Sequence, residues 1–322
     1  MVWHYFRPAP SAAPPTPGAG TTHQNKLKST KPMRHTLLFA AVALASTATA
    51  QYGTFDNKAV ASAKGATTIV LRDANDSPFN TGLLNAVKAD WKFTANTDFG
   101  TITDLVAAPV NPANIYLLKV RKTDKEKHTA TFLALVQGWK MKKGEMLHVE
   151  DNAVTNVPPG QELASIMIDA QLLDNGGAAM LNVYVKNLQD YLKQVESGKI
   201  TDKTTADRLY TGRNRFIKDQ ELWVAKEQLD KTLADLAAIK GTYQQEVKLM
   251  GLPQLMAAAS KGQPGVCLAD VVITGEYKTK WCFRRVFNAS TGELMYLRDE
   301  AALFDKKMGF IVEDFRVLEQ AR

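Results

Sequence analysis

Two cysteines have the spacing that most directly suggests chemistry. Cys267 and Cys282 lie in consecutive apolar runs, "GVCLADVVIT" and "KWCFRRVF", which are typical of neighbouring strands. A turn between Thr274 and Gly275 would place the cysteines opposite one another, at the Cβ separation that a disulfide needs. A turn centred on "EYKT" would shift the register and leave two small buried side chains instead. We expect the Cys267–Cys282 disulfide.

Acidic and amide side chains gather in "RDANDSPFN", where Asp73, Asn75 and Asp76 follow a buried-strand pattern. Oxygen ligands at alternate positions can begin a calcium loop, but the later Gly and Glu of such a loop are missing here. We therefore expect a strand-to-helix turn in which Ser77 caps the helix and Pro78 occupies its first turn. The position at the carboxyl end of a strand still allows a small-ligand site.

Catalytic motifs are missing from the sequence. It has no zinc-binding H-E-x-x-H, no G-x-S-x-G nucleophile elbow and no phosphate-binding glycine loop. His128 and His148 lie in or near predicted turns. Glu162, Asp169 and Asp174 offer paired carboxylates for a hydrolase, although surface or capping roles suit them equally. The sequence thus predicts no catalytic residue, no metal ligand and no cofactor.

Apolar runs predict the same order of elements in both halves of the chain. The first half reads as strand "TTIVLRD", a helix, strand "WKFT", helix "TITDLVA" and a hairpin of "NIYLLKVR" and "TATFLALVQGW". The second reads as "ELWVAKE", helix "LDKTLADLAAIKGTY", "YQQEVKLM", helix "GLPQLMAAAS" and the cysteine-bearing hairpin. Strand centres are about 23, 24 and 17 residues apart in the first half and about 23, 23 and 15 in the second. This pattern predicts an internal duplication.

A mostly helical segment is predicted between the halves, with an apolar stripe that includes Leu181, Tyr184 and Leu188. Such a helix should pack across one or both sheets. We predict an α/β fold with two similar β-α-β-α-β-β units, whose sheets are mixed because crossovers pair parallel and hairpins antiparallel. The predicted boundaries are 1–32 for a disordered extension, 33–50 for a signal peptide, 51–145 for the first unit, 146–215 for the bridge and 216–322 for the second unit.

An export signal begins inside the chain, at Met33. A basic start, a short apolar run and the small-x-small sequence "ATA" predict cleavage between Ala50 and Gln51. The residues before Met33 are rich in Pro, Ala, Gly and Thr and should be disordered. We interpret them as an over-long N-terminus, with translation starting at Met33; a genuine long extension is the alternative.

Removal of this segment changes the charge of the protein. The whole chain has 40 basic and 33 acidic residues, and residues 1–50 contain five of the basic and none of the acidic ones. The mature chain would therefore have 35 basic and 33 acidic residues, a net charge of +2 instead of +7. The high positive charge was the main evidence for a nucleic-acid partner, and this evidence is thereby removed. In "WCFRRVF", strand alternation predicts one face on the core and one in water.

The residues "IVLRDANDSPFNTGLLNAVKADWKFT", followed by a hairpin, resemble a group of uncharacterised exported proteins of Bacteroidota. The stretches "AAMLNVYVKNLQDYL" and "RFIKDQELWVAKEQLD" are similar to the middle of that group. These motifs are structural, so the resemblance implies no activity. The order of elements resembles, more weakly, the N-terminal domain of TolB-type periplasmic proteins, which implies an envelope or assembly role.

Together these features predict a soluble periplasmic or secreted protein that acts by binding or structural interaction. Its partner would be an envelope protein or a small ligand, and the mature chain would have no transmembrane anchor. The alternative is a secreted hydrolase with a carboxylate-based site. A deep pocket that gathers two carboxylates would favour the hydrolase, whereas a shallow apolar groove or an exposed sheet edge would favour the binder.

Overall fold

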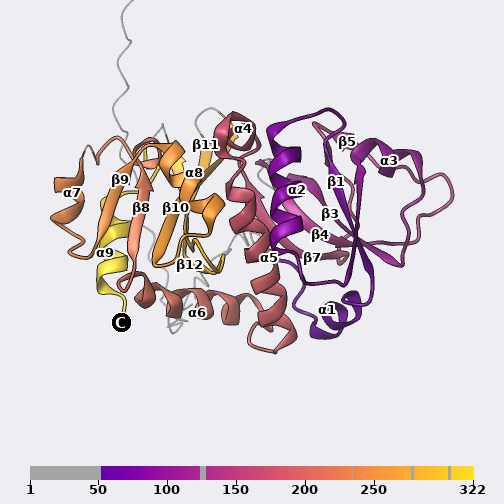
Figure 1. The fold of residues 1–322 in the computed structure, drawn as a ribbon, viewed down its shortest axis with the longest axis horizontal. Coiled ribbons are helices and arrows are strands. Elements are labelled where there is room, and N and C mark those ends of the chain that lie inside the picture. Colours follow the sequence, from indigo (N-terminus) through magenta and orange to yellow (C-terminus); the bar gives the residue numbers. More distant parts are fainter. Residues whose placement is uncertain (1–51, 124–127, 234, 277–278, 304–305) are drawn as a thin grey trace, which may run out of the picture. The chain divides into compact units, whose positions relative to one another are not determined.

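The protein has an α/β fold with two mixed sheets, as the sequence predicts (Figure 1). The computed structural model describes residues 52–322, except 124–127, 234, 277–278 and 304–305. Both sheets belong to one compact unit. The predicted extension and signal peptide, including the cleavage site at Ala50 and Gln51, lie outside the described residues.

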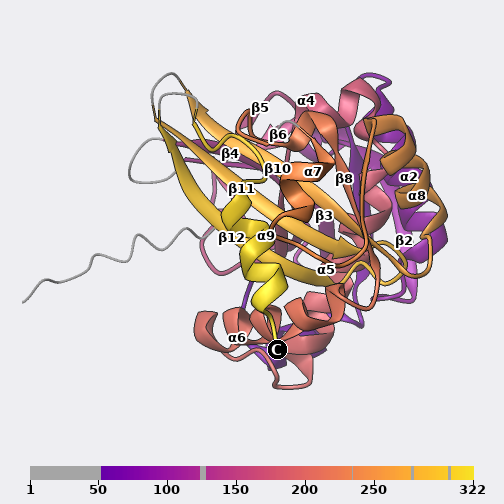
Figure 2. The same cartoon turned by 90° about the vertical axis from the view of Figure 1, so that its left-hand side faces the viewer.

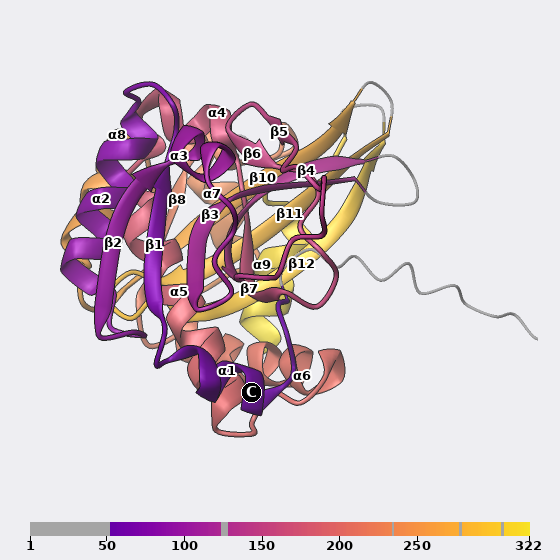
Figure 3. The same ribbon diagram turned by 90° about the vertical axis from the view of Figure 1, so that its right-hand side faces the viewer.

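The first sheet has the order β2-β1-β3-β4-β7 (Figure 3). β1 is parallel to β2 and β3, whereas β4 is antiparallel to β3 and β7. A short hairpin of β5 and β6 pairs with β3. The strands are β1 (Thr67–Arg72), β2 (Asn96–Thr101), β3 (Asn114–Thr123), β4 (Thr129–Gln137), β5 (Val149–Glu150), β6 (Ala153–Val154) and β7 (Glu162–Ile168).

The second predicted strand is displaced along the chain. "WKFT" is not a strand, and β2 begins only at Asn96. The indole Nε1 of Trp91 donates to Thr68 Oγ1 at 3.2 Å, and the hydroxyls of Thr68 and Thr94 lie 2.6 Å apart. This stretch therefore anchors the end of helix α2 (Pro78–Asp90) to the core beside β1. The strand itself is polar and exposed at the sheet edge, so alternation does not reveal it.

The second sheet has the order β9-β8-β10-β11-β12, with the same strand directions as β2-β1-β3-β4-β7. Its strands are β8 (Glu221–Ala225), β9 (Val247–Met250), β10 (Val266–Glu276), β11 (Thr279–Asn288) and β12 (Leu294–Leu303). The two sheets thus share strand order, in keeping with the predicted pattern. A common origin by duplication stays a prediction.

The prediction of a helix over "LDKTLADLAAIKGTY" is mostly wrong. Among the described residues of this stretch, only α7 (Leu236–Lys240) is α-helical, and its first residue, Leu236, is exposed. The Asp230 carboxylate accepts hydrogen bonds from the backbone and hydroxyl of Thr232, and Asp235 caps α7. Such local side-chain bonds compete with helix formation and explain the late start.

Helix α5 (Met180–Glu196) is the predicted bridging helix. It packs on α1, α2 and β7 on the side of the first sheet and on α8 on the side of the second, within a core cluster shared by both halves (Figure 1). The predicted bridge begins too early, because β5, β6 and β7 belong to the first sheet. The remaining helices are α1 (Asn57–Ala63), α3 (Ile102–Ala107), α4 (Ala170–Leu172), η1 (Leu173–Gly177), α6 (Lys203–Arg213), η2 (Asn214–Ile217), η3 (Lys226–Gln228), α8 (Leu252–Lys261) and α9 (Val312–Gln320).

A buried arginine of the second sheet, Arg285, is bonded to both sheets. Arg285 of β11 donates from Nε to Asp270 Oδ2 at 2.8 Å and from Nη1 to the backbone oxygen of Met167 in β7 at 2.8 Å. The hydroxyl of Tyr184 in α5 donates to Asp270 Oδ1 at 3.1 Å. One network therefore connects β7, the central helix and the second sheet.

Both faces of β11 are buried, so the expectation that one face meets water is wrong. Phe283 joins Val272 of β10 against Phe132 and Met167 of the first sheet. On the opposite face, the guanidinium of Arg284 pairs with Asp314 of α9, which covers that side of the sheet (Nη1–Oδ2 3.0 Å; Figure 2). The charged residues in "FRRVF" lie in the core because each one has a buried carboxylate partner.

The predicted disulfide is wrong: both cysteines are buried and unbonded. Cys267 lies opposite Asn288, whereas Cys282 lies opposite Ile273, six positions further along β10. The cysteines are therefore roughly 20 Å apart along the sheet. The last paired residues are the first and last of "EYKT", so the hairpin has the second of the two registers that the sequence allows.

In the described part of the chain, no helix has both the length and the apolar character needed to cross a membrane.

Both thiols should resist alkylation in the native protein and react after unfolding without any reductant. Neither side chain is exposed, and burial raises the pKa of each thiol to about 12. We expect the intact mass to show no added group after iodoacetamide treatment of native protein, and two groups after treatment in denaturant. Thiols that react only after reduction would show that a disulfide forms after all.

Replacing Asp270 by Ala should destabilise the protein by about 3–5 kcal/mol, because Arg285 would remain buried without its carboxylate. Urea unfolding measures this loss. Asp219→Ala, at an exposed aspartate, is the matched control and should change the free energy of unfolding by less than about 0.5 kcal/mol. An equally small effect for both variants would contradict the role given to the Arg285–Asp270 pair.

Candidate functional site

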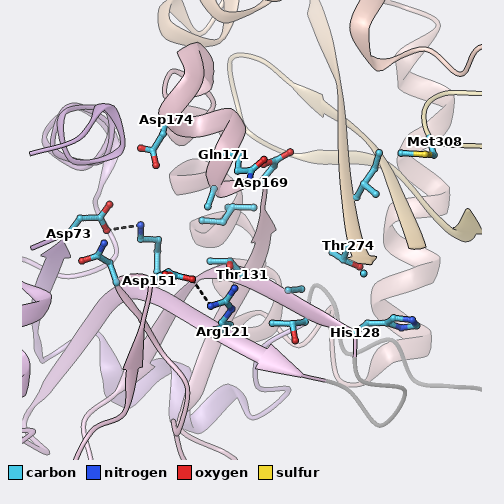
Figure 4. A pocket seen from close by; sticks show the side chains of 18 residues that line it. Asp73, Arg121, His128, Thr131, Asp151, Asp169, Gln171, Asp174, Thr274 and Met308 are labelled. Carbon is cyan, nitrogen blue, oxygen red and sulfur yellow. Dashed lines mark hydrogen bonds and ion pairs between the residues drawn. The ribbon is translucent and has the colours of Figure 1, made fainter. Parts of the chain in front are cut away.

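A polar pocket with a volume of about 1010 Å³ lies where strand ends of the two sheets meet (Figure 4). Its first-sheet walls come from the residue after β1, the end of β3, the start of β4 and the end of β7. The end of β10 and Met308 form the wall on the second-sheet side. Segments distant in the sequence therefore converge on one cavity.

The strand order of the first sheet explains the location of the pocket. After β1 the chain leaves for β2 on one side, and it then returns to β3 on the other side of β1. The connections that leave β1 and precede β3 thus diverge and open a crevice outside the carboxyl ends of the two strands. Asp73 directly follows β1, and Lys119 lies on β3 beside it.

Asp73 and Lys119 form a buried ion pair at this crevice. The Lys119 Nζ lies 2.6 Å from Asp73 Oδ1, and each residue is only 6% exposed. The ammonium also lies 4.3 Å from the ring centroid of Phe79, which favours the cation electrostatically. Ser77 donates its hydroxyl to Asp73 Oδ2 at 3.2 Å. The contacts with Phe79 and Ser77 thereby hold the ion pair in place at the base of the pocket.

The β5–β6 hairpin forms a second wall. Its turn residues, Asp151 and Asn152, both have positive φ (49° and 61°), which Asp and Asn tolerate better than other non-glycine residues. The Asn152 Oδ1 accepts a hydrogen bond from the backbone of Ala74 at 3.0 Å, and Arg121 donates to Asp151 Oδ2 at 2.7 Å. The hairpin is therefore tied to both β1 and β3.

The third wall carries carboxylates from the turn between β7 and α5. Asp169 caps α4 by accepting from the backbone of Leu172 at 3.0 Å, and Asp174 follows in η1. The helix is interrupted at Asn175 and at Gly176, which has φ 96° and so favours glycine. Asp169, Gln171 and Asp174 all line the pocket, and Figure 4 shows the Asp174 carboxylate well apart from that of Asp169.

The second sheet closes the opposite side through Ile273, Thr274, Gly275 and Met308 (Figure 4). Thr274 is 9% exposed, and its hydroxyl has no hydrogen-bond partner among the residues that the structure describes. The Thr274 oxygen is not one of the fully buried side-chain atoms that lack a partner, so water in the pocket can bind it.

In the second sheet, the strand end that corresponds to the end of β1 is covered by the chain itself. The chain after β8 is covered by the segment that precedes α9: Phe310 donates to Gln228 O at 2.9 Å and accepts from Asp230 N at 3.0 Å. Gly309 lies so close that a Cβ there would be 2.6 Å from Gln228 O. Although the strand orders match, the carboxyl end of β8 is thus occupied by the chain itself.

The predicted site residues are only partly brought together. Of the acidic turn, Asp73 lines the pocket, whereas Asn75 and Asp76 do not. The helix-capping role expected for this turn is confirmed, because Ser77 Oγ accepts from Asn80 N at 3.2 Å.

Two of the three carboxylates proposed for a hydrolase, Asp169 and Asp174, do line the pocket. The third, Glu162, pairs with Lys122 at 2.6 Å and is not among the lining residues. His128 lines the pocket and His148 does not.

Sequence reasoning missed Lys119, Arg121 and Thr274. A lysine inside the apolar run "NIYLLKVR" is the one signal that could have revealed Lys119, because a charge in a buried strand needs a partner. Thr274 gives no such signal, since threonine is common in strands.

The pocket shows no ready-made metal centre. Within the described ranges, no group of three His, Cys, Asp or Glu residues is arranged to hold a metal ion. The arrangement can instead bind a polar molecule through charged and hydroxyl groups set in rigid walls.

Comparisons with known proteins leave the family open. No protein-family model matches the chain, and no curated protein or solved structure matches it. The resemblances to exported proteins of Bacteroidota and to TolB-type domains stay predictions. Function is therefore inferred from the site.

A double-mutant cycle on Asp73 and Lys119 should show strong coupling. Asp73→Ala or Lys119→Met alone leaves one buried charge unpaired and should lower the free energy of unfolding by about 3–5 kcal/mol. The double variant removes both charges, so its loss should be smaller than the sum of the single losses by about 1–3 kcal/mol. Urea unfolding of the four proteins measures the coupling, and additive losses would contradict a mutually dependent pair.

Proposed function

We propose that this protein is exported and acts by binding a small polar ligand in the pocket between the two sheets. The observation that carries the proposal is the position of this pocket: it lies at the β1–β3 switch point and is lined by polar groups held in place by the fold. Strand ends at such a point are the usual place for ligands in open α/β sheets.

The walls support binding because they are fixed before a ligand arrives. Asp73 is held by Lys119 and Ser77, and the β5–β6 hairpin is tied to the chain after β1. Preorganised groups lose little conformational entropy when a ligand binds. A cavity of about 1010 Å³ suits a small molecule rather than a protein surface. Of the two partner classes expected from the sequence, the small ligand is therefore favoured over an envelope protein.

Export rests on the signal that begins at Met33 and ends at Ala50. On this proposal, the mature chain begins at Gln51 and works in the periplasm or outside the cell. The first described residues are already packed on the first sheet, since Thr54 N donates to Leu163 O at 3.2 Å.

A carboxylate-based hydrolase is the second candidate, and one observation favours it. The pocket gathers Asp169 and Asp174, which is the arrangement that distinguishes a hydrolase from a binder on a shallow groove. The two functions share the same pocket and differ in whether the bound molecule leaves unchanged. Incubating the isolated ligand with the protein and measuring its mass would separate them: an intact ligand supports binding, and a cleaved one supports hydrolysis.

Protein isolated gently from the envelope or culture fluid of its own cells should carry a bound small molecule. Under denaturing conditions, the intact mass should correspond to a chain that begins at Gln51. Under native conditions, the mass should be larger by that of one ligand. A cytoplasmic chain that begins at Met1 would overturn export, and equal native and denatured masses would overturn binding.

Gln171→Trp provides the matched test of the site. Gln171 is exposed at the pocket wall, so a large ring there fills the opening without disturbing the core. We expect the added native mass to disappear in this variant. Gln254→Trp, on the exposed side of α8, is the control and should keep it. Loss of the ligand from both variants, or from neither, would show that the molecule does not occupy this pocket.

A further inference from the structure

Polar side chains dominate the lining of the pocket. Six of the eighteen lining residues are Ala, Gly, Ile or Met, and the other twelve have polar or charged side chains. Small-molecule sites are more often lined by hydrophobic and aromatic residues with a few polar groups among them. A ligand of this pocket therefore has to form hydrogen bonds over most of its surface, because a polar group that loses water without gaining a partner is unfavourable.

Hydrogen-bond donors are available on the walls formed by β3 and the β5–β6 hairpin. An ammonium has three N–H groups, and the only carboxylate near that of Lys119 among the described residues is Asp73. Arg121 uses Nη1 for its ion pairs, and its Nη2 donates to no other residue that the structure describes. Asn152 accepts a backbone hydrogen bond through Oδ1, which leaves its amide N–H groups for a ligand.

Hydrogen-bond acceptors are available on the wall between β7 and α5. Asp174 has no hydrogen bond or ion pair within the described ranges, and Asp169 uses Oδ1 alone, to cap α4. Figure 4 shows these two carboxylates and the Arg121 guanidinium at separate places around the pocket. No single ion can therefore contact all of them, whereas a molecule with several polar groups can bind each one separately.

The combination of donors and acceptors favours an uncharged ligand with several hydroxyls. An anion would be repelled by the carboxylates, and an ammonium would be repelled by Lys119 and Arg121. A hydroxyl both donates and accepts, so the hydroxyls of one molecule can bind both kinds of wall. Hydrogen bonds with one charged partner are about twice as strong as neutral ones, so an uncharged ligand still benefits from these ionic groups.

The size of the cavity indicates a ring rather than a very small polyol. Its volume of about 1010 Å³ lies at the upper end of the range of small-molecule sites, which is about 300–1,000 Å³. Ala130 and Ile168 also line the pocket. A sugar ring has C–H groups as well as hydroxyls, so it can cover such apolar surface while it forms hydrogen bonds elsewhere.

From this arrangement we propose that the ligand is an uncharged sugar of one or a few rings. Its hydroxyls accept hydrogen bonds from Lys119, Arg121 and Asn152 and donate hydrogen bonds to Asp169 and Asp174. This inference rests on the proposed binding function and names its ligand class.

The molecule that copurifies with the native protein tests the ligand class directly. Denaturation releases it, and ion exchange then shows its charge. Permethylation adds one methyl group for each hydroxyl, so the mass before and after this reaction counts the hydroxyls. We expect an uncharged molecule with at least about three hydroxyls, enough to bind groups on more than one wall.

Calorimetric titration of the full chain measures the contribution of each wall. The probes are glucose, galactose, mannose, maltose and cellobiose, and we expect at least one of them to bind. For that sugar, Arg121→Met and Asp174→Ala should each weaken binding about ten-fold, because each removes one charge-assisted hydrogen bond. A charged ligand would respond differently: loss of Arg121 would favour an ammonium, and loss of Asp174 would favour an anion.

The two variants are chosen to keep the fold. Arg121 pairs with Asp151 at the surface, where such pairs contribute little stability, and Asp174 makes no bond that its replacement would break. Both variants should therefore unfold at the temperature of the natural chain. Arg208→Met and Asp219→Ala are the matched controls, because both residues are exposed and neither lines the pocket. The controls should leave the affinity for the sugar unchanged.

The outcomes separate this inference from the proposed function. A released molecule that is charged or has fewer hydroxyls would overturn the sugar class while supporting a ligand site. Opposite effects of Arg121→Met and Asp174→Ala on binding would lead to the same conclusion. If the native protein carries no added mass and none of the sugars binds, both proposals fail.

Discussion

The fold depends on one buried guanidinium. Arg285 binds Asp270 within its own sheet and the backbone of Met167 in the other sheet, while Tyr184 of the central helix binds the same carboxylate. A buried ion pair adds little stability compared with apolar packing, but it allows few alternative arrangements, because any displacement leaves a charge unpaired. The network therefore fixes which strand of one sheet meets which strand of the other.

The geometry of the pocket depends on this network. Asp169 follows Met167 by two residues at the end of β7, and Thr274 follows Asp270 by four residues near the end of β10. The two polar walls are thus short extensions of the strands that Arg285 holds together. A shift of one sheet against the other by one strand spacing, about 4.8 Å, would separate groups that now face one cavity.

The class of fold was predictable because alternation and helical periodicity report which face of each element is buried. The register between β10 and β11 was not predictable. The turn in "GVCLADVVITGEYKTKWCFRRVF" has two acceptable positions, and only the pairing along the whole of both strands decides between them. The burial of charged side chains was the second feature that the sequence did not predict. Strand alternation puts Arg284 and Arg285 on opposite faces of β11 and predicts that one face meets water, whereas both arginines and Lys119 are buried because each meets a carboxylate that the sequence does not reveal. Asp169 and Asp174 were recognised as candidates, whereas their neighbours across the pocket come from distant strands.

The covered strand end in the second sheet has a consequence for stoichiometry. Two sheets of identical strand order would ordinarily suggest two equivalent sites and cooperative or biphasic saturation. Here the chain around Gly309 packs against Gln228 and covers the carboxyl end of β8, while the preceding residue, Met308, lines the first-sheet pocket. The second sheet thus contributes Met308 to the pocket of the first sheet, while its own β8 strand end is covered. Saturation at one molecule per chain, along a simple hyperbola, is the behaviour that this asymmetry implies.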